Sequence, residues 1–499
     1  MTTVLAIDLG GSALKACLFD VDGEPLASTS IPLGFDEDPI GHSEQDPQRW
    51  WDALAVSVSQ VRDHRAFDAG DIAAIVICGF TRTQIFLNDH GHVLRPAIGF
   101  RDSRSLGPAN EALAKPGVVH HLQARHLNAF HPLARLLWLQ HNEPETWGAT
   151  HLVLEPKDYL NLRLTGHAMS DRISQSWLIS AMRGSEPTLA RLAGVERDLL
   201  PEIGDPTTLV GRVRDGLPGA LSALAGAQVL CGSNDTWTAV AGLGAMRQGC
   251  AYCISGSSEV FGLLTGTNTP AEGLITIGWA NDLWQIGGPG QNGSNAINWI
   301  VEVLDPGERP LAQKLDTLLA QPVNRRPLIF HPYLHGERTP FWDRDLRASF
   351  IGLTAAHGPG DMVRAVMEGV ALLNRTVLQR AEAAAGHKAD EVRIAGGGAR
   401  NAVWNGIRAN ILGRRVLASP ANEMGLRGCL AIARVGLALN TDVGAAGIAL
   451  SDDFTFFEPD HSQSARYRAL YSVFEETMDS VAQASHRLAA IGREQFDGN

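Results

Sequence analysis

The chain has 499 residues, too many for one hydrophobic core, and its length predicts two or more large domains. Its composition, 44% hydrophobic and 19% charged, is typical of a globular protein in water. The 42 basic and 54 acidic residues leave a net charge of −12, which disfavours nucleic acid and anionic membranes as partners. No apolar run is long enough to span a membrane, and we expect a cytoplasmic protein.

The first predicted element is a hairpin with an acid at its tip. Residues 4–7 and 14–19 read as buried strands, and Gly10, Gly11 and Ser12 form the tight turn between them. Asp8 interrupts the first apolar run just before these glycines. A carboxylate beside backbone amides bared by glycine suggests a site for a hydrated cation and a phosphate.

Further elements of the first half follow from apolar periodicity and capping residues. The sequence predicts helices at 47–62, 132–139 and 157–164, a strand at 72–78, and a hairpin of 84–87 with 93–94. Four histidines between residues 120 and 131 match no metal-ligand spacing and are interpreted as surface or packing residues.

An acid follows the short apolar strand at 230–231. Asp235 opens a helix of small residues, and a side chain there projects from the carboxyl end of a strand, where open α/β sheets place their sites. The alternative is a helix N-cap, which Asn234 would fill equally well. We therefore favour a functional role for Asp235.

The second half repeats the opening hairpin. Strands at 251–254 and 259–264 flank the small-residue turn of Gly256, Ser257 and Ser258. Two such hairpins would let two α/β domains face each other across a cleft, each presenting amides to one phosphate chain. Cys250 and Cys253 lie in this strand and point to opposite faces, which disfavours a metal or redox site. The six cysteines, mostly in apolar runs, are expected to be reduced and buried.

A third strand-turn element contains Gly396, Gly397 and Gly398, between a strand at 392–395 and a helix beginning near Asn401. These glycines would let the backbone approach a flat ring or a phosphate, although a plain connection has the same composition. In the loop 330–343, the adjacent Glu337 and Arg338 are interpreted as a structural ion pair.

Nine segments together resemble the FGGY family of carbohydrate kinases, most closely its xylulose kinases, and the resemblance covers nearly the whole chain. They are AIDLGGSALKACLFD, GHSEQDPQRWWDAL, GHVLRPAIGFRDSR, HPLARLLWL, KDYLNLRLTG, GSNDTWTAVAGLGAMRQGCAYCISGSS, PYLHGERTPFWD, MEGVALLNR and GGGARNAVWNGIRANIL. Each is modest alone, but nine in the family's order are specific. The resemblance implies two actin-like (ribonuclease H-like) α/β domains flanking a central cleft, with residues 1–246 on the sugar side and 247–499, including a helical tail, on the nucleotide side.

The resemblance also implies roles for the residues singled out above. Asp8 would help hold Mg²⁺, and Asp235 would take the proton from the attacking hydroxyl. The residues implied to bind ATP are Gly10, Gly11, Ser12, Gly256, Ser257 and Ser258 at the phosphates, and Gly396, Gly397, Gly398 and Asn401 at the adenosine. Phosphoryl transfer asks mainly for alignment and charge neutralisation, so one base, one metal and two amide-lined turns suffice.

The acceptor loop of the family maps to GFTRTQIFL. Thr81-Arg82 stands where xylulose kinases have Met-His, and Arg82-Thr83 where glycerol kinases have Arg-Glu, so neither pattern is complete. Asp102 matches a family aspartate that either lines the sugar pocket or pins its loop. Phe130, in place of a glycerol kinase tyrosine, weakens the glycerol option, and the opening DLGGS…LKA resembles the L-xylulose branch.

We therefore expect an ATP-dependent kinase that phosphorylates a terminal hydroxyl of a pentulose such as xylulose, with Arg82, Thr81, Thr83, Asp102 and Asp235 at the acceptor. The alternatives are a glycerol- or erythritol-type polyol kinase, a non-catalytic actin-like ATP-binding switch, and a sugar sensor. ATP and the sugar are the expected ligands. The oligomeric state is open, a homodimer included.

Overall fold

The computed structural model describes residues 2–38, 41–64, 68–280, 282–324, 326–421, 423–451 and 454–496. The chain forms two compact units, Met1–Gly244 with Gly425–Leu450, and Ala245–Met424 with Ser451–Asn499. Each is an α/β unit, which confirms the predicted fold class, whereas the cleft between them stays a prediction. Among the described helices, none combines the length and apolarity needed to cross a bilayer.

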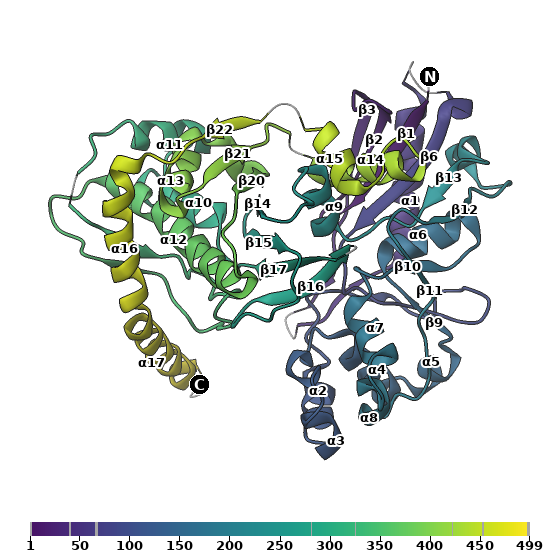
Figure 1. Ribbon diagram of the computed structural model, residues 1–499. Coiled ribbons are helices and arrows are strands. Elements are labelled where there is room, and N and C mark those ends of the chain that lie inside the picture. Colours follow the sequence, from purple (N-terminus) through teal and green to yellow (C-terminus); the bar gives the residue numbers. More distant parts are fainter. Residues whose placement is uncertain are drawn as a thin grey trace. The chain divides into compact units, whose positions relative to one another are not determined.

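A six-stranded mixed sheet forms the centre of the first unit (Figure 1). The order of its strands is β12 (Leu209–Arg212), β13 (Gln228–Leu230), β6 (Ile72–Gly79), β1 (Thr3–Leu9), β2 (Ala13–Asp20), β3 (Pro25–Pro32). β1 pairs antiparallel with β2 and parallel with β6, and β13 pairs parallel with β6. The opening hairpin is therefore at the middle of the sheet, where it was predicted as a buried pair of strands.

The two faces of β1 have different neighbours. Leu5, Ile7 and Leu9 share a core with α1 (Pro47–Arg62), the helix predicted over these same residues. The Asp46 side chain caps α1 by accepting the N–H of Gln48 at 2.9 Å. The alternate residues, Asp8 among them, point to the opposite face because strand side chains alternate.

The other face of this sheet is covered by a segment from far along the chain. Helix α14 (Met424–Gly436) places Cys429 so that its thiol contacts the Ile7 carbonyl, with Sγ and O 3.5 Å apart. The sequence predicts one domain boundary, after residue 246, whereas the chain changes unit after Gly244, Met424 and Leu450. Apolar periodicity shows that α14 is amphipathic but not which sheet it covers.

The remaining elements of the first unit are shorter. Its helices are α2 (Leu106–Leu113), α3 (Pro116–Val119), α4 (Pro132–Asn142), α5 (Pro144–Ala149), α6 (Pro156–Thr165), α7 (Ser176–Arg183), α8 (Leu189–Ala193), α9 (Asp235–Gly242) and α15 (Val443–Ala449). Its small sheets are β4 (Asp36–Glu37) with β5 (Ser43–Gln45) and β8 (Ala97–Ile98), β7 (Ile85–Leu87) with β9 (Leu152–Leu154), and β10 (Met169–Asp171) with β11 (Glu202–Gly204).

The second unit is built on a seven-stranded sheet. The order of its strands is β16 (Ile275–Ala280), β17 (Leu283–Pro289), β15 (Glu259–Thr265), β14 (Cys250–Ser255), β20 (Glu391–Ala395), β21 (Arg415–Ala418), β22 (Thr455–Phe457). β14 pairs antiparallel with β15 and parallel with β20, as β1 does with β2 and β6. The two sheets thus share one topology around their hairpins, as the repeated glycine turns predict.

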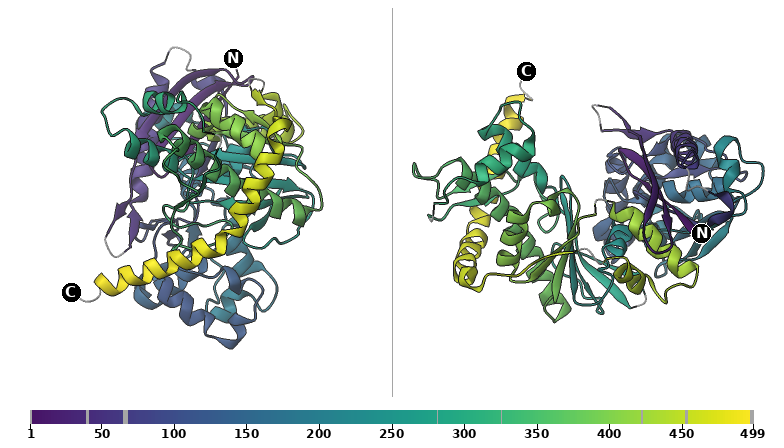
Figure 2. Two further views of the ribbon diagram at one scale, coloured as in Figure 1. Left: turned by 90° about the vertical axis from the view of Figure 1, so that its left-hand side faces the viewer. Right: turned by 90° about the horizontal axis from the view of Figure 1, so that it is seen from above.

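Helices complete the second unit. They are α10 (Ser294–Leu304), α11 (Leu311–Leu319), α12 (Pro359–Ala385), α13 (Ala402–Leu412), α16 (Ser464–Glu476) and α17 (Met478–Phe496), with a small sheet of β18 (Ile329–His331) and β19 (Ser349–Ile351). Figure 2 shows α16 and α17 in succession as the yellow helical tail of this unit. All six cysteines of the chain are free and buried, as predicted.

Candidate active site

Asp8 and Asp235 lie at the same edge of the first sheet. Asp8 is paired with Cys78 across the parallel strands β1 and β6. The next residue, Gly79, forms a parallel bridge with Asn234, and its N–H donates to the Ser233 carbonyl at 3.3 Å. Because neighbouring strands are about 4.8 Å apart, the backbones at Asp8 and Asp235 are separated by roughly 10 Å.

A buried thiol lies near both acids. The hydrogen bond to Cys429 and burial, together with the nearby Asp8 and Asp235 carboxylates, raise the pKa of Cys78 well above its ordinary value. The electrostatics of Cys78 therefore agree with the strand register. Both place the two carboxylates near Cys78 at the carboxyl edge of this sheet.

Asp235 is held at the first turn of α9 but does not cap it. Asn234 is the N-cap, with its side-chain oxygen 2.8 Å from the N–H of Trp237. The Oδ1 atom of Asp235 accepts the N–H of Thr236 at 2.6 Å and its hydroxyl at 3.3 Å. Burial raises the pKa of Asp235, while Thr236 and the Arg82 charge oppose that shift. Asn234 thus occupies the capping position, and capping does not account for Asp235.

Asp8 is packed against the first turn of α14. A Cβ atom at Gly425 would be 2.4 Å from Oδ2 of Asp8, so a larger residue there would displace this carboxylate. Asp8 is partly exposed. A hard carboxylate that keeps some access to water suits Mg²⁺, which binds proteins through one or two carboxylates and retains several waters.

The turn after Asp8 has a tight geometry. The Gly10 N–H donates to the Ala13 carbonyl at 2.9 Å, and the Ser12 carbonyl accepts the Leu33 N–H at 2.8 Å. The Gly10 amide is therefore engaged within the hairpin. Phosphate binding by the predicted residues Gly11 and Ser12 stays a prediction.

The acceptor loop follows β6 and is held by two helices. Both oxygens of Glu155, the N-cap of α6, accept backbone N–H groups of this loop, those of Arg82 and Thr83, at 3.1 Å each. The buried guanidinium of Arg135 in α4 donates to the Arg82 carbonyl and, at 2.9 Å, to the Gly99 carbonyl. These contacts support a left-handed backbone at Arg82, whose φ is 59°.

The Arg82 side chain projects over an aromatic ring. Its guanidinium carbon is 5.2 Å from the centre of the Trp177 ring, and the His131 ring stacks on the same indole at 5.3 Å. Burial lowers the pKa of Arg82, and the Glu155 and Asp235 carboxylates oppose that shift. The pKa of His131 is about 3, lowered first by burial, so this ring is neutral. Arg82 is therefore a partly exposed cation with the charge of Asp235 nearby.

The other predicted acceptor residues differ in exposure. Thr81 is partly exposed, whereas Thr83 and Asp102 are fully buried. The Asp102 carboxylate accepts the Ser43 N–H at 2.7 Å and two N–H groups of the Arg104 guanidinium, from Nε at 2.8 Å and Nη2 at 2.7 Å. This geometry favours the loop-pinning alternative for Asp102 over a place in the pocket.

The small-residue turn of the second unit rests on a helix N-terminus. Gly256 and Ser257 are exposed, and the Gly256 N–H donates to the Ser258 carbonyl at 3.0 Å. The first residue of α10 binds the turn: the N–H of Ser294 donates to the Gly256 carbonyl at 3.1 Å. The turn therefore presents its outer side to solvent.

The three glycines at 396–398 have different environments. Gly397 is exposed, with no atom within 4 Å of where its Cβ would stand, so it is free to approach a ligand. Gly398 is buried, and a Cβ there would be 2.0 Å from the hydroxyl oxygen of Ser255. Asn401 caps α13 by accepting the Trp404 N–H at 2.9 Å. Gly398 and Asn401 thus shape the turn itself.

A buried ionic network, which the sequence did not predict, adjoins these turns. Glu259 pairs with Arg408 and accepts hydrogen bonds from Ser255 at 2.6 Å and Asn374 at 2.5 Å. Arg408 also donates to the Gly398 carbonyl at 3.1 Å. The network ties β14, β15, α12 and α13 to the turn. Its one sequence signal is a lone arginine within the apolar helix pattern at 402–412.

Glu337 organises a nearby loop of the second unit. Its carboxylate accepts the N–H of Gln291 at 2.6 Å and the amide of Asn292 at 2.9 Å, and Arg338 donates to the Gly290 carbonyl at 2.5 Å. The charges thus act mainly on the 290–292 backbone. This agrees with a structural role for both residues, although the contacts differ from a simple ion pair.

Comparison with known proteins gives the family directly. The N-terminal domain of the FGGY family of carbohydrate kinases matches residues 3–242, and the C-terminal domain of the same family matches residues 251–437. The chain belongs to the FGGY family of carbohydrate kinases. It is therefore a sugar kinase of a family that uses ATP, as the nine segments imply.

Individual relatives differ in the substrates that they are named for. A xylulose kinase of Lactococcus lactis subsp. lactis (strain IL1403) is 28% identical, covering 99% of this chain and 100% of that one. A gluconokinase of Bacillus subtilis (strain 168) is 25% identical over 87% of each chain. The crystal structure of a ligand-bound xylulose kinase from Lactobacillus acidophilus superposes with a TM-score of 0.87 at 23% identity, covering 98% of this chain and 100% of the other.

Proposed function

We propose that this FGGY kinase transfers the γ-phosphoryl group of ATP to a terminal hydroxyl of an open-chain pentulose such as xylulose. The observation that carries the proposal is the common sheet edge of Asp8 and Asp235, with the Arg82 cation close to Asp235. Asp8 would hold the metal ion, Asp235 would take the proton of the reacting hydroxyl, and Arg82 would bind the acceptor. Xylulose kinases among the relatives that span nearly the full chain support the choice of a pentulose.

Asp235 acts as the general base. The Thr236 contacts on Oδ1 orient the carboxylate, so that its other oxygen receives the proton of the acceptor hydroxyl. The hydroxyl oxygen then bonds to the γ-phosphorus as the bond from that phosphorus to the bridging oxygen breaks, and ADP leaves. Arg82 donates to hydroxyl groups of the acceptor and fixes its orientation.

The nucleotide contacts come from glycine turns in both units. Gly11 and Ser12, with Ser257 and Ser258, offer amides to the phosphate chain, and the turn at 396–398 borders the adenosine. Asp8 would hold Mg²⁺, which neutralises charge on the phosphates when bound.

A second candidate acceptor is a sugar acid such as gluconate. A gluconokinase is among the relatives, and a guanidinium such as that of Arg82 would pair with a carboxylate. The two candidates differ in the charge of the acceptor, which the same assay separates.

The test is a screen of acceptor-dependent ADP release with D- and L-xylulose, ribuloses, gluconate, glycerol and erythritol. We expect the highest kcat/KM with a pentulose. Asp235→Asn keeps the shape of the side chain and should lower kcat roughly 100-fold or more. Asp46→Asn is the matched control, because asparagine caps α1 as well as aspartate does.

Each part of the proposal has its own contrary result. Full activity of Asp235→Asn would reject its role as the base. A preference for gluconate would reject the pentulose and keep the kinase. ADP release that no acceptor stimulates would favour the ATP-binding switch.

A further inference from the structure

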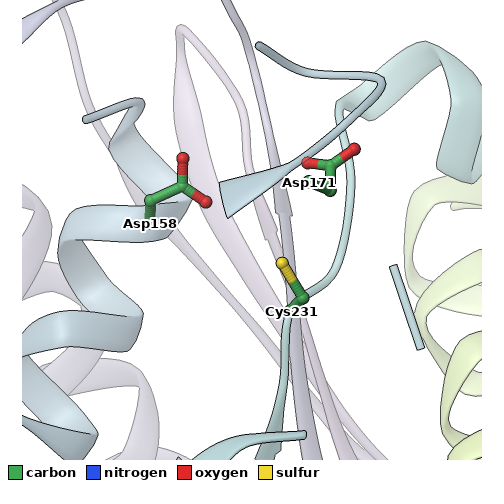
Figure 3. A group of neighbouring side chains, drawn as sticks. All are labelled: Asp158, Asp171 and Cys231. Carbon is green, nitrogen blue, oxygen red and sulfur yellow. The ribbon is translucent and has the colours of Figure 1, made fainter. Parts of the chain in front are cut away.

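A buried charged cluster lies behind the strand that leads to Asp235. It comprises Lys157 and Asp158 of α6, Asp171 at the end of β10, and Cys231 after β13. Figure 3 shows the last three side chains converging from these elements. The four side chains are no more than 1% exposed. None of them has a role in the chemistry proposed above.

The cluster contains its own cation. The side-chain oxygens of Asp158 and Asp171 and the Cys231 sulfur lie within 4.8 Å of one another, a grouping that resembles a metal site. However, Nζ of Lys157 is 2.5 Å from Oδ1 of Asp158 and 2.9 Å from Oδ1 of Asp171. The ammonium group thus fills the position of a metal ion, and the cluster is an internal ion-pair network.

This network binds the segment 231–233 at two points. The Cys231 carbonyl accepts Nζ of Lys157 at 3.3 Å and the side-chain amide of Asn161 at 3.0 Å. The hydroxyl of the fully buried Ser233 donates to Oδ2 of Asp171 at 2.8 Å. The two points flank Gly232, whose φ is 70° and whose Cβ, if present, would be 1.9 Å from the Ile77 carbonyl. The backbone between β13 and Asp235 is therefore held in one conformation.

Asp171 is itself fixed. Its Oδ2 accepts the N–H groups of Ile173 and Ser174 at 3.1 and 3.0 Å. Burial opposes its ionisation, but Lys157 and Ser174 outweigh burial and lower the pKa of Asp171. Burying such ions costs more than an apolar core of equal volume, so stability alone does not account for them.

We propose that Asp171 and Lys157 are positioning residues that set the place of Asp235 through Ser233 and the Cys231 carbonyl. The inference rests on the proposed role of Asp235 as the base. Its physical basis is that a displacement of about 1 Å in a catalytic group costs up to 100-fold in rate. Only one residue, Asn234, separates Ser233 from Asp235, so loss of the Ser233 anchor moves the carboxylate.

The test compares two serine substitutions in the same cluster. Ser233→Ala removes the hydrogen bond to Asp171. Ser170→Ala is the matched control, because Ser170 is equally buried and donates to Oδ2 of Asp158 at 2.5 Å, yet among the described residues its hydroxyl makes no hydrogen bond to segment 231–235. The two variants should lose similar stability.

We expect Ser233→Ala to lower kcat roughly 10-fold with KM values for ATP and acceptor within about twofold, and Ser170→Ala to keep the wild-type kcat. The acid limb of the pH profile of kcat should move in Ser233→Ala alone, because the surroundings of Asp235 change. Hydrogen exchange at residues 232–236 should also accelerate in that variant.

A Ser233→Ala enzyme with wild-type kcat and pH profile would overturn the inference, as would equal kcat losses in both variants. If Ser233→Ala does not fold, Ser233→Cys replaces it; because its thiol is a weaker donor, we expect a smaller loss of kcat with the same direction of pH shift, and an unchanged kcat and pH profile would again overturn the inference. Asp235→Asn separates the two levels: its full activity refutes the base itself, whereas its inactivity beside an unaffected Ser233 variant refutes only the positioning role.

Discussion

The carboxyl group of Glu155 should make the stability of the folded protein depend on pH. It is 1% exposed and accepts two backbone N–H groups of the acceptor loop, and burial raises its pKa to about 8. In the unfolded chain a glutamate ionises near pH 4.3. The folded state therefore binds an extra proton between these values, so the resulting stability is complete below about pH 4 and is lost as pH rises through 8.

The size of the effect follows from the pKa difference. One proton contributes about 1.4 kcal/mol per pH unit, and the slope halves close to the folded pKa. Between about pH 6 and pH 8 the wild type should thus lose about 2 kcal/mol that a glutamine at this position cannot lose. Glu155→Gln keeps the shape and one acceptor oxygen, which makes it the suitable reference.

The assay is urea unfolding of both proteins near pH 6 and near pH 8. Contributions from other titrating groups cancel in the difference between wild type and Glu155→Gln. Glu111→Gln, an exposed position in α2, is the control and should follow the wild type at both pH values. If the difference between wild type and Glu155→Gln is the same at both pH values, the carboxyl group ionises normally and the reasoning from burial fails.

Two further predictions concern the acceptor and the nucleotide. Arg82→Ala should raise the acceptor KM roughly 10- to 100-fold and leave the ATP KM unchanged in steady-state kinetics. Asp102→Asn should cost about 1–3 kcal/mol of stability in thermal unfolding, with little change in acceptor KM. A raised acceptor KM in Asp102→Asn without loss of stability would instead place Asp102 in the acceptor pocket. Gly398→Ala places a Cβ 2.0 Å from the Ser255 hydroxyl oxygen, so the turn must shift, and the ATP KM should rise roughly 10-fold; an unchanged ATP KM would separate this turn from the nucleotide.

Local features of the fold were readable from the sequence. The helix at 47–62, the hairpins at both glycine turns and the placement of Asp235 after a strand follow from apolar periodicity and turn residues. These patterns involve residues close in the chain. The family membership follows from the order of nine such patterns.

Contacts between segments that are distant in the chain could not be predicted from the sequence. Glu155 and Arg135 hold the backbone of Arg82 from 73 and 53 residues away. Lys157 lies in a predicted helix, where a lone lysine reads as an exposed residue, yet it is buried between two carboxylates. Periodicity tells which face of a helix is apolar. It does not tell which polar side chains find partners inside, because those partners depend on the topology.

The return of residues 425–450 to the first unit has a consequence for biosynthesis. The face of β1 opposite α1 is covered by α14, so it stays bare while residues 245–424 of the second unit are being translated. The nascent amino-terminal half consequently has to keep its central strands from aggregating until nearly the end of synthesis. For such a chain, an expressed amino-terminal fragment is an unfinished folding intermediate, and the carboxyl-terminal part of the gene is needed to complete both halves.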